Sequence, residues 1–355
     1  MRLSRLALCL TITGCGSAQD SAQNVAGYLR QLRDRGEITG SVLVNRGGST
    51  LVNEGFGFAE EDLRSPNTPG TRFRVGSVTK QFTAMAVLIL QERGMVQVSH
   101  SVCDYIPNCP AHWQPINLHH LLTHSSGIPD YTNFDDFASL IDTPVTVEQL
   151  IDRFRSIELE FSPGSRWKYS NSSYILLGDI IERTSGQSYA EFLNQNIFQP
   201  LGMQSTGYDS NDPPVPAHAQ GYLRPGVKPV HFDMSEVYAA GALYSTTEDL
   251  YLWDEALLAG RLISGEQLRQ MIAPQIPCPG GGCALPTDVG YGYGWFIARE
   301  AAQNYIYHWG HIDGFLSSNG FYPDAHLIVV VLSNLETTDV FGISTQLGKL
   351  AAPSP

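Results

Sequence analysis

The sequence predicts an α+β fold: an antiparallel sheet formed from both chain ends and flanked by helices, with a mostly helical lobe inserted between its strands. Alternating apolar segments typical of strands occur near the N-terminus and again late in the chain, whereas the middle is rich in helical patterns. At 355 residues, the chain is long enough to bury a large core, either as one domain or as two interwoven lobes.

Residues 1–18 are predicted to be a targeting segment outside the fold. Two arginines precede a short apolar stretch, Leu6 to Ile12, which is too brief to span a bilayer. Ile12 to Cys15 (ITGC) resembles the bacterial lipobox, in which Cys15 would be lipidated and become the first mature residue. Ordinary cleavage after Ala18 is the alternative. We therefore expect an exported protein that is periplasmic, anchored to the membrane through Cys15, or secreted.

The remaining cysteines also indicate an oxidising compartment. They fall as two close pairs, each bracketing a turn-rich loop, so we expect two local disulfides, Cys103–Cys109 and Cys278–Cys283. Zinc is the alternative, but neither pair has the C-x2-C spacing of a structural zinc site.

The first elements of the fold are a surface helix and a hairpin. The helix is expected at Ala22 to Arg35. The segments Gly40 to Asn45 and Thr50 to Phe58 alternate as strands do, and Gly47-Gly48 between them is typical of a hairpin turn.

The later elements follow from periodicity and capping signals. Helices are expected at 78–93, 118–123, 146–157 with Thr146 as its cap, 173–184, 189–197 and 246–259. Strands are expected at 293–299, 305–308, 315–322 and 327–334, with a closing helix at 342–350. We therefore expect residues 20–355 to form a single domain, with 20–75 and 285–355 as an α/β lobe and 76–284 as a helical lobe.

The most informative chemical motif is Ser77-Val-Thr-Lys80, which lies where an apolar helix begins. A helix this apolar belongs inside a protein. Residues i and i+3 share a helix face, so the Ser77 hydroxyl and the Lys80 ammonium are able to meet. The helix N-terminus adds unpaired N–H groups beside the hydroxyl. This arrangement is typical of a nucleophilic serine, and S-x-x-K occurs in serine enzymes that handle acyl groups.

Two alternatives apply to this motif. A serine at a helix start is often only an N-cap, and a second S-x-x-K occurs as Ser165-Arg-Trp-Lys168. Lys80 favours catalysis in the first copy, because an ammonium in an apolar helix is costly without a partner. The second copy precedes no apolar helix, so we expect Ser165 and Lys168 to be loop or strand residues.

Two further motifs carry groups able to act on a substrate. Tyr169-Ser-Asn171 lies between a turn and a helix, where the phenol could move protons and the amide could hold a carbonyl. Packing and helix capping are the alternatives for these two side chains. His308-Trp-Gly310 ends a strand, where a small residue lets a ligand or another backbone come close.

Other catalytic patterns are weak or absent in the sequence. His120 and His124 have the i, i+4 spacing of a helical metal site, but no third ligand is marked, and we expect a structural role and no metal. No serine has the G-x-S-x-G context of a nucleophile elbow, which argues against an α/β-hydrolase.

Taken together and in this order, the three motifs resemble those of the penicillin-binding, class C β-lactamase-like serine hydrolases. That family includes D-alanyl-D-alanine carboxypeptidases and β-lactamase-fold esterases. The resemblance covers nearly all of the chain beyond the targeting segment and implies a β-lactamase/transpeptidase-like fold. Further phrases that look like the family's are HLLTHSSGIP (120–129), PGSRWKYSN (163–171), PLGM (200–203) and YGYGW (291–295).

The resemblance implies a role for each matching residue. Ser77 would be the acylated nucleophile, Lys80 would take or shuttle its proton, and Tyr169 would be the general base that later protonates the leaving group. We expect Lys80 to lower the pKa of Tyr169 and favour its phenolate. Backbone N–H groups of Ser77 and His311 would form the oxyanion hole. The expected substrate-binding residues are Asn171, His308, Trp309, Gly310 and His311, and no cofactor is expected.

The third motif departs from the family pattern, which usually has Lys or His, then Thr, then Gly. Trp309 stands at the Thr position and lacks the hydroxyl of a carboxylate clamp, while His308 is mostly neutral near pH 7. His311 could compensate in part. We therefore expect an esterase-like hydrolase in which Trp309 offers apolar surface to the substrate.

Other functions remain open from the sequence. The first alternative is a D-alanyl-D-alanine carboxypeptidase or β-lactamase, and the second is a non-catalytic binding or sensor module. In every case the expected ligand is a small ester, amide or peptide. The net charge of −13 and the absence of a long Lys/Arg cluster argue against nucleic-acid binding. The oligomeric state is left open.

Overall fold

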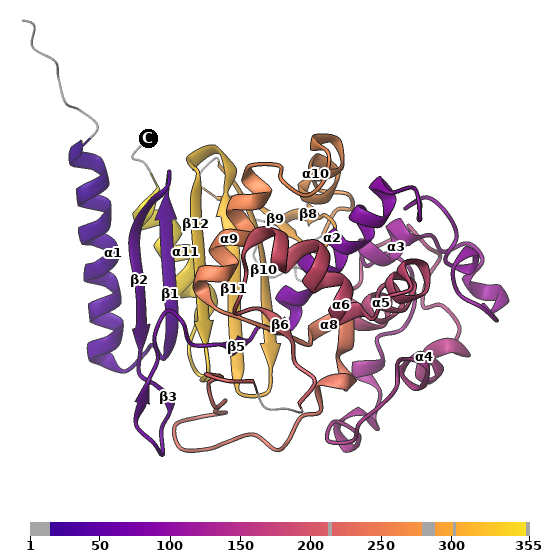
Figure 1. The fold of residues 1–355 in the computed structure, drawn as a ribbon, viewed down its shortest axis with the longest axis horizontal. Coiled ribbons are helices and arrows are strands. Elements are labelled where there is room, and N and C mark those ends of the chain that lie inside the picture. The colour runs from indigo at the N-terminus through magenta and orange to yellow at the C-terminus, as the bar shows by residue number, and fades with distance from the viewer. Residues whose placement is uncertain (1–14, 212–214, 279–287, 301–302, 353–355) are drawn as a thin grey trace, which may run out of the picture.

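The largest element of the fold is a seven-stranded antiparallel sheet in the order β2-β1-β12-β11-β10-β9-β8 (Figure 1). It is seen in a computed structural model that describes residues 15–211, 215–278, 288–300 and 303–352. The strands are β1 (Gly40–Arg46), β2 (Ser49–Phe56), β8 (Asp288–Tyr291), β9 (Phe296–Glu300), β10 (Gln303–Ile312), β11 (Phe315–Tyr322) and β12 (Leu327–Ser333). Because β1 pairs with β12, both ends of the chain share this sheet, and the predicted α+β class is confirmed.

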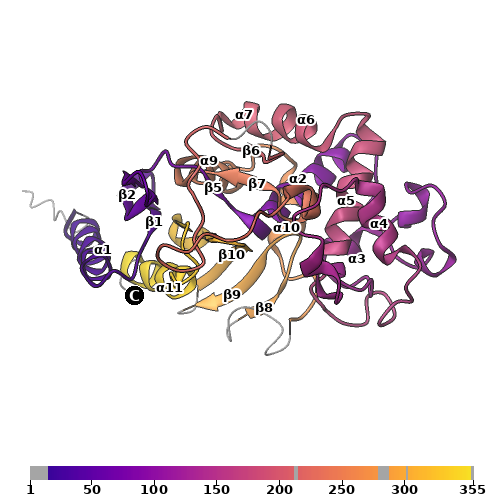
Figure 2. The ribbon, with the colours of Figure 1, turned by 90° about the horizontal axis from the view of Figure 1, so that it is seen from below.

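Helices cover both faces of the sheet. α1 (Cys15–Arg35) and α11 (Val340–Ala351) lie on one face and α9 (Thr247–Leu258) lies on the other (Figure 2). Side chains alternate between two apolar cores accordingly: Val42 and Val44 of β1 pack on the α11 side, and Leu43 between them packs on the α9 side. Because a strand is pleated, successive side chains point to opposite faces of the sheet. The same alternation determines the face to which each side chain of β10 points.

The other helices gather on the side of the molecule away from α1 (Figure 1). Their centre is α2 (Thr79–Glu92), in which every residue from Thr79 to Leu90 is buried and against which α5 and α8 pack. The remaining helices are α3 (Leu118–Leu122), α4 (Val147–Arg155), α5 (Asn171–Ser185), α6 (Tyr189–Leu193), α7 (Gln199–Leu201), α8 (Tyr238–Gly241) and α10 (Gly265–Ile272).

Two small sheets complete the described architecture. One pairs β3 (Phe58–Glu60) with β4 (Ser65–Pro66). The other joins β5 (Phe73–Arg74), β7 (Leu243–Ser245) and β6 (Gly207–Tyr208), in that order. Within this sheet, β5 lies just before α2 in the chain, and its pairing with β7 fixes the approach to that helix.

Most predicted elements are present close to their predicted bounds. The predicted cap of α4 is confirmed, because the Thr146 side chain accepts from the Gln149 backbone N–H in a capping box. α1 begins at Cys15, well before the predicted Ala22. The short elements β8, α8 and α10 were not predicted. The division into lobes at 20–75 with 285–355 and at 76–284 remains a proposal.

The cysteine predictions are met as far as the described residues reach. Cys103 and Cys109 form the predicted disulfide. Cys278 is disulfide-bonded as well, and its predicted partner Cys283 lies outside the described residues, as do residues 1–14 of the targeting segment. In the part of the chain that the structure describes, no helix is both long enough and apolar enough to cross a membrane.

Candidate active site

Ser77 lies in a short 3-10 helix, η1 (Gly76–Val78), which leads directly into α2. Strand β10 approaches this turn very closely. A Cβ atom on Gly310 would come within 2.0 Å of the Val75 carbonyl oxygen and 2.8 Å of the Ser77 nitrogen. Gly310 therefore acts through the absence of a side chain, which lets the strand reach the backbone of the serine.

Lys80 meets Ser77 as predicted, with its Nζ atom 3.0 Å from the Ser77 Oγ atom. The side chain is fully buried, and its Nζ atom also donates to the Asn171 Oδ1 atom and to the Ala240 carbonyl oxygen, both at 2.8 Å. Burial lowers the pKa of Lys80 to about 7, although the Asp130 carboxylate opposes this shift. Lys80 is thus able to exchange a proton near neutral pH.

The contacts of Lys80 suit its neutral form. Two of its three partners are carbonyl oxygens, which only accept hydrogen bonds, and a neutral amine has two N–H groups for them. Its lone pair then remains for the third partner, the Ser77 hydroxyl. In this state the amine accepts the proton that Ser77 must lose to become a nucleophile.

Tyr169 contacts the same hydroxyl from another direction, and its phenol donates to the Ser77 Oγ atom at 2.7 Å. Its ring also lies over the Lys80 ammonium, 4.8 Å from the Nζ atom. The prediction that Lys80 lowers the pKa of Tyr169 is wrong: burial raises this pKa well above its usual value, and the hydrogen bond to Ser77 opposes the shift only in part. Tyr169 is therefore a proton donor at neutral pH, and Lys80 is the better base.

Asn171 and Asp130 hold Lys80 in place. The Asn171 Nδ2 atom donates to the Asp130 Oδ2 atom at 3.1 Å and to the Thr132 Oγ1 atom at 3.2 Å, which turns the amide oxygen toward Lys80. Asp130 is buried and was not predicted as a site residue. It immediately follows the phrase HLLTHSSGIP, which ends at Pro129, so extending that phrase by one residue would have reached it.

His124 supports the segment that carries Tyr169. It is buried, its ring lies 4.3 Å from the Tyr169 ring, and its Nδ1 atom accepts from the Ser170 backbone N–H at 3.1 Å. Helix α3 ends at Leu122, so His120 and His124 do not share a helix face, and His120 instead caps that helix at Asn117. Both contacts agree with the expected structural role.

The third motif lies differently from the prediction. His308 is buried, and its Nε2 atom forms a 3.0 Å hydrogen bond with the Tyr291 hydroxyl. Burial lowers the pKa of His308 to about 3, so the ring is neutral. It does not line the pocket beside Ser77. Trp309 points to the α11 face of the sheet, as the alternation along β10 requires, and its ring packs 5.9 Å from the ring of Phe341. The expectation that Trp309 offers apolar surface to the substrate is therefore wrong.

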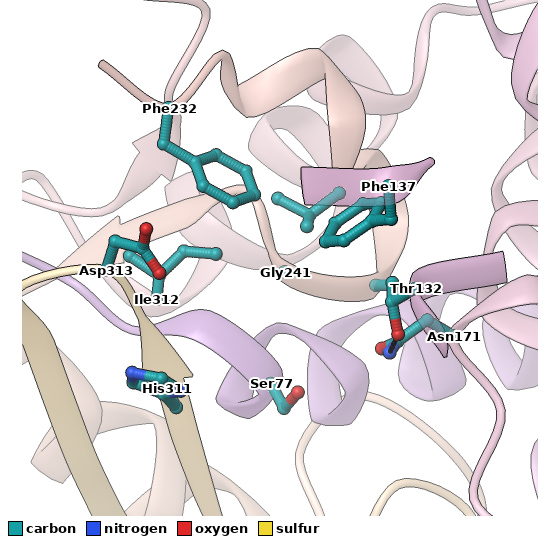
Figure 3. Close-up of a pocket in the computed structure, with 11 residues that line it drawn as sticks. Ser77, Thr132, Phe137, Asn171, Phe232, Gly241, His311, Ile312 and Asp313 are labelled. Atoms are coloured by element: carbon teal, nitrogen blue, oxygen red, sulfur yellow. Dashed lines mark hydrogen bonds between the residues drawn. The ribbon is translucent and has the colours of Figure 1, made fainter. Parts of the chain in front are cut away.

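The pocket beside Ser77 has a volume of about 290 Å³. Figure 3 shows Asn171 and Thr132 at one end of it, His311, Ile312 and Asp313 at the other, and Phe137 and Phe232 across from Ser77. Beyond Tyr307 no described strand pairs with the outer side of β10, so the backbone around His311 faces this pocket as an open edge. Of the predicted substrate-binding residues, Asn171 and His311 line the pocket, and Gly310 lies against the Ser77 backbone.

The second S-x-x-K contributes nothing to this arrangement. Ser165 and Lys168 lie in an exposed loop, and the Lys168 Nζ atom pairs with the Glu160 carboxylate at 2.6 Å. These residues were expected in a loop or a strand, and they lie in a loop.

The Beta-lactamase family matches residues 25–352, which is most of the chain. The chain therefore belongs to the beta-lactamase family. Members of this family are typically serine hydrolases, and the chain is a hydrolase of this fold with penicillin-binding protein-like relatives.

Individual relatives agree with the family. The Bacillus subtilis protein PbpX, which carries the name of a penicillin-binding protein, is 31% identical over 326 residues, covering 91% of this chain and 76% of its own. The octameric penicillin-binding protein homologue of Pyrococcus abyssi is 28% identical with a TM-score of 0.79, covering 93% of this chain and 77% of its own.

A third relative has a different activity in its name. The D-amino acid amidase of Ochrobactrum anthropi SV3, solved with L-phenylalanine amide, is 25% identical with a TM-score of 0.81. The match covers 93% of this chain and 98% of the amidase. One fold of this kind therefore accommodates both penicillin-binding proteins and an amidase.

Proposed function

We propose that this protein hydrolyses an amide bond of a small substrate that lacks a carboxylate, through an acyl-Ser77 intermediate. The observation that carries the proposal is the contact of both Lys80 and Tyr169 with one hydroxyl, that of Ser77. A base and an acid on the same oxygen are what acyl transfer to a serine needs.

In the acylation step, the neutral Lys80 takes the proton of the Ser77 hydroxyl while the oxygen attacks the substrate carbonyl. The negative charge that develops on the carbonyl oxygen is stabilised by the backbone N–H groups of Ser77 and His311. As the C–N bond breaks, Tyr169 gives its proton to the leaving amine, and Lys80 returns a proton to Tyr169. Water then attacks the acyl carbonyl while its proton passes to Tyr169 and the Tyr169 proton passes to Lys80. As the bond between the acyl carbon and the Ser77 oxygen breaks, Lys80 returns the proton to that oxygen.

Two features support an amide as the substrate. An amine leaves a carbonyl only when it is protonated, and burial keeps Tyr169 in the protonated form that can supply this proton. The likeness to a D-amino acid amidase over almost its whole length points the same way. The same residues would also cleave esters, because an alcohol leaves the carbonyl carbon more easily than an amine does.

The composition of the pocket supports a substrate without a carboxylate. Among the described residues that line it there is no lysine or arginine, and Asp313 is its one carboxylate. A carboxylate clamp needs a cation or several hydrogen-bond donors. The expected preference for esters depended on an indole that faces the substrate. Trp309 packs on the other face of the sheet, so it does not support that preference.

The test is a parallel screen of D- and L-phenylalanine amide, a short-chain ester, a chromogenic β-lactam and a D-Ala-D-Ala peptide. We expect amide turnover that is lost in Ser77→Ala and kept in Ser165→Ala, the matched serine of the exposed S-x-x-K loop. Mass spectrometry of quenched reactions should detect the acyl group on Ser77. Preferred turnover of the β-lactam or the D-Ala-D-Ala peptide would overturn the amide assignment.

We also propose that the protein is exported and held to a membrane through a lipidated Cys15. Support comes from the Cys103–Cys109 disulfide, which is typical of oxidising compartments. Wild-type protein should partition into a detergent phase and Cys15→Ser should not. A wild type that stays in the aqueous phase would rule out the anchor.

A further inference from the structure

The pocket beside Ser77 has apolar walls between two polar ends, one of which carries a carboxylate. Phe137, Phe232, Val237 and Ile312 form its apolar walls, and Asp313 closes the end formed by the β10–β11 turn (Figure 3). A substrate whose carbonyl carbon sits at Ser77 would place its acyl portion along these walls. Asp313 and Ser77 line the same pocket, so a cationic group on the acyl portion that faces the β10–β11 turn would meet Asp313.

Asp313 has no partner of its own. Its carboxylate makes no hydrogen bond or ion pair with any described residue, although the side chain is half-buried. Burial and the neighbouring Glu336 raise the pKa of Asp313, and His311 opposes this shift only in part, so the anionic form is destabilised on balance. A cation bound in the pocket would relieve both effects.

The nearby protein cations do not meet this need. Arg74 and Lys228 line an adjoining hollow that shares Asp313 and Phe232 with the pocket. The Arg74 Nε atom is paired with Asp209 at 2.8 Å, and the Lys228 Nζ atom is paired with Asp62 at 2.8 Å. His311 also favours the Asp313 anion, but its Nε2 atom lies 3.0 Å from the Glu336 Oε1 atom and forms no ion pair with Asp313. The Asp313 carboxylate can therefore still pair with a ligand cation.

A metal ion is the rival occupant, because ligand atoms of His311, Asp313 and Glu336 all lie within 4.8 Å of one another. However, the Glu336 Oε1 atom already accepts from the Gly314 backbone N–H at 2.7 Å and lies 3.0 Å from the His311 Nε2 atom. A metal held by the Glu336 Oε1 and His311 Nε2 atoms would displace these contacts, whereas an ammonium group needs only the Asp313 carboxylate.

We infer that Asp313 binds a free ammonium group on the acyl side of the substrate, so that the enzyme selects amino-acid amides with an unblocked amine and an apolar side chain. The apolar walls accept the side chain and Asp313 accepts the amine. This inference rests on the proposed amide hydrolysis and adds a residue that determines specificity.

The test compares phenylalanine amide, in both enantiomers, with 3-phenylpropanamide, which has the same size without the amine. Binding is measured by calorimetry on Ser77→Ala, so the result does not depend on turnover and stays separate from the proposed hydrolysis. We expect one enantiomer of the free-amine compound to bind about 10 to 100 times more tightly than the desamino compound, the usual gain from a hydrogen bond to a charged group.

Adding Asp313→Asn should reduce this ratio to about one without weakening 3-phenylpropanamide, since the asparagine keeps the shape and removes the charge. Asp324→Asn is the matched control, an exposed carboxylate beyond the opposite end of β11, and should keep the full ratio. The inference fails if neither enantiomer is preferred, including the case where nothing binds, or if Asp313→Asn keeps the preference. It also fails if the preference appears only with added Zn²⁺ and is removed by EDTA, because a metal would then occupy the site.

Discussion

At the scale of single residues, Lys80 is the group whose protonation sets the chemistry. Because burial lowers its pKa to about 7, the neutral amine that accepts the Ser77 proton forms as the pH rises through this value. We expect kcat/KM to rise with pH along an acid limb centred near 7. His308 does not contribute to this limb, since its pKa of about 3 lies far below it.

Lys80→Arg provides a direct check on that interpretation. A guanidinium keeps the positive charge but does not lose a proton at any pH used in the assay. We expect kcat to fall about 10²- to 10⁴-fold, the usual contribution of a positioned base. A pH–rate profile of both proteins is the measurement, and a variant with near wild-type kcat would show that the cation, and not the base, is what matters.

Asp130 is expected to act on the reaction only through Asn171 and Lys80. Its carboxylate raises the pKa of Lys80 and accepts the Asn171 amide. Asp130→Asn should therefore lower kcat about 10-fold or more, from the misplaced amide, and move the acid limb to lower pH, because the charge that favours the ammonium is gone. A loss of kcat with an unmoved acid limb would assign Asp130 a purely structural role.

At the scale of elements, the site depends on how closely β10 lies against η1. The Cβ atom of Gly310→Ala would meet two backbone atoms that cannot move independently of the serine. We expect a loss of kcat/KM of at least about 100-fold from displacement of the oxyanion donors. Gly27→Ala in α1 is the control, since its nearest neighbour is the flexible end of Arg30 at 3.9 Å, and it should leave activity unchanged.

The opposite face of the same strand should be silent in catalysis. Trp309→Thr removes ring packing against Phe341 and is expected to cost about 1–2 kcal/mol of stability. The ratio of kcat/KM between the amide and the β-lactam should stay within about twofold, because no pocket residue changes. Thermal unfolding and the two kinetic assays test this prediction. A rise in β-lactam turnover alone would show that Trp309 does affect the substrate site.

Helices and strands with strong periodicity could be predicted from the sequence, and so could the meeting of Ser77 with Lys80, because spacing along one helix fixes it. The direction of Trp309 could not, since it depends on the register of β10 and on which face α11 covers. The pKa of Tyr169 was missed for a related reason: it reflects burial created by distant segments, which outweighs the nearby ammonium that sequence reasoning could see. Asp130 adjoins a family phrase but its contact with Asn171 depends on the fold, and Asp313 belongs to no motif, so the role of each becomes visible only once its neighbours are in place.

At the scale of the whole molecule, the buried Lys80 should cost stability in a pH-dependent way. Its pKa is about 7 in the folded state and about 10.5 in the unfolded chain, so the unfolded chain binds the extra proton between these values. This cost is absent above about pH 10.5, grows as the pH falls toward 7, and is fully present below 7. The free energy of unfolding of Lys80→Met, relative to that of the wild type, should therefore rise by about 2–3 kcal/mol as the pH falls from 9 to 7.

Denaturant unfolding of both proteins across this range is the measurement, and the wild-type loss is read as the difference between them so that other groups cancel. A difference that stays constant from pH 9 to 7 would mean that Lys80 keeps an ordinary pKa, which would also remove the basis for its role as a base.

The pairing of β1 with β12 affects when the protein is able to fold during its synthesis. Ser41 in β1 lies opposite Leu332 in β12. A strand synthesised early therefore cannot form this pairing until a strand near the end of the chain has been synthesised. Contacts between such distant segments slow folding. Until the last strand leaves the ribosome, β1 has only β2 beside it, and a two-stranded hairpin is at best marginally stable. The nascent chain should therefore remain without its main sheet throughout translation, and a chain in that state can still be threaded through a narrow channel before it folds.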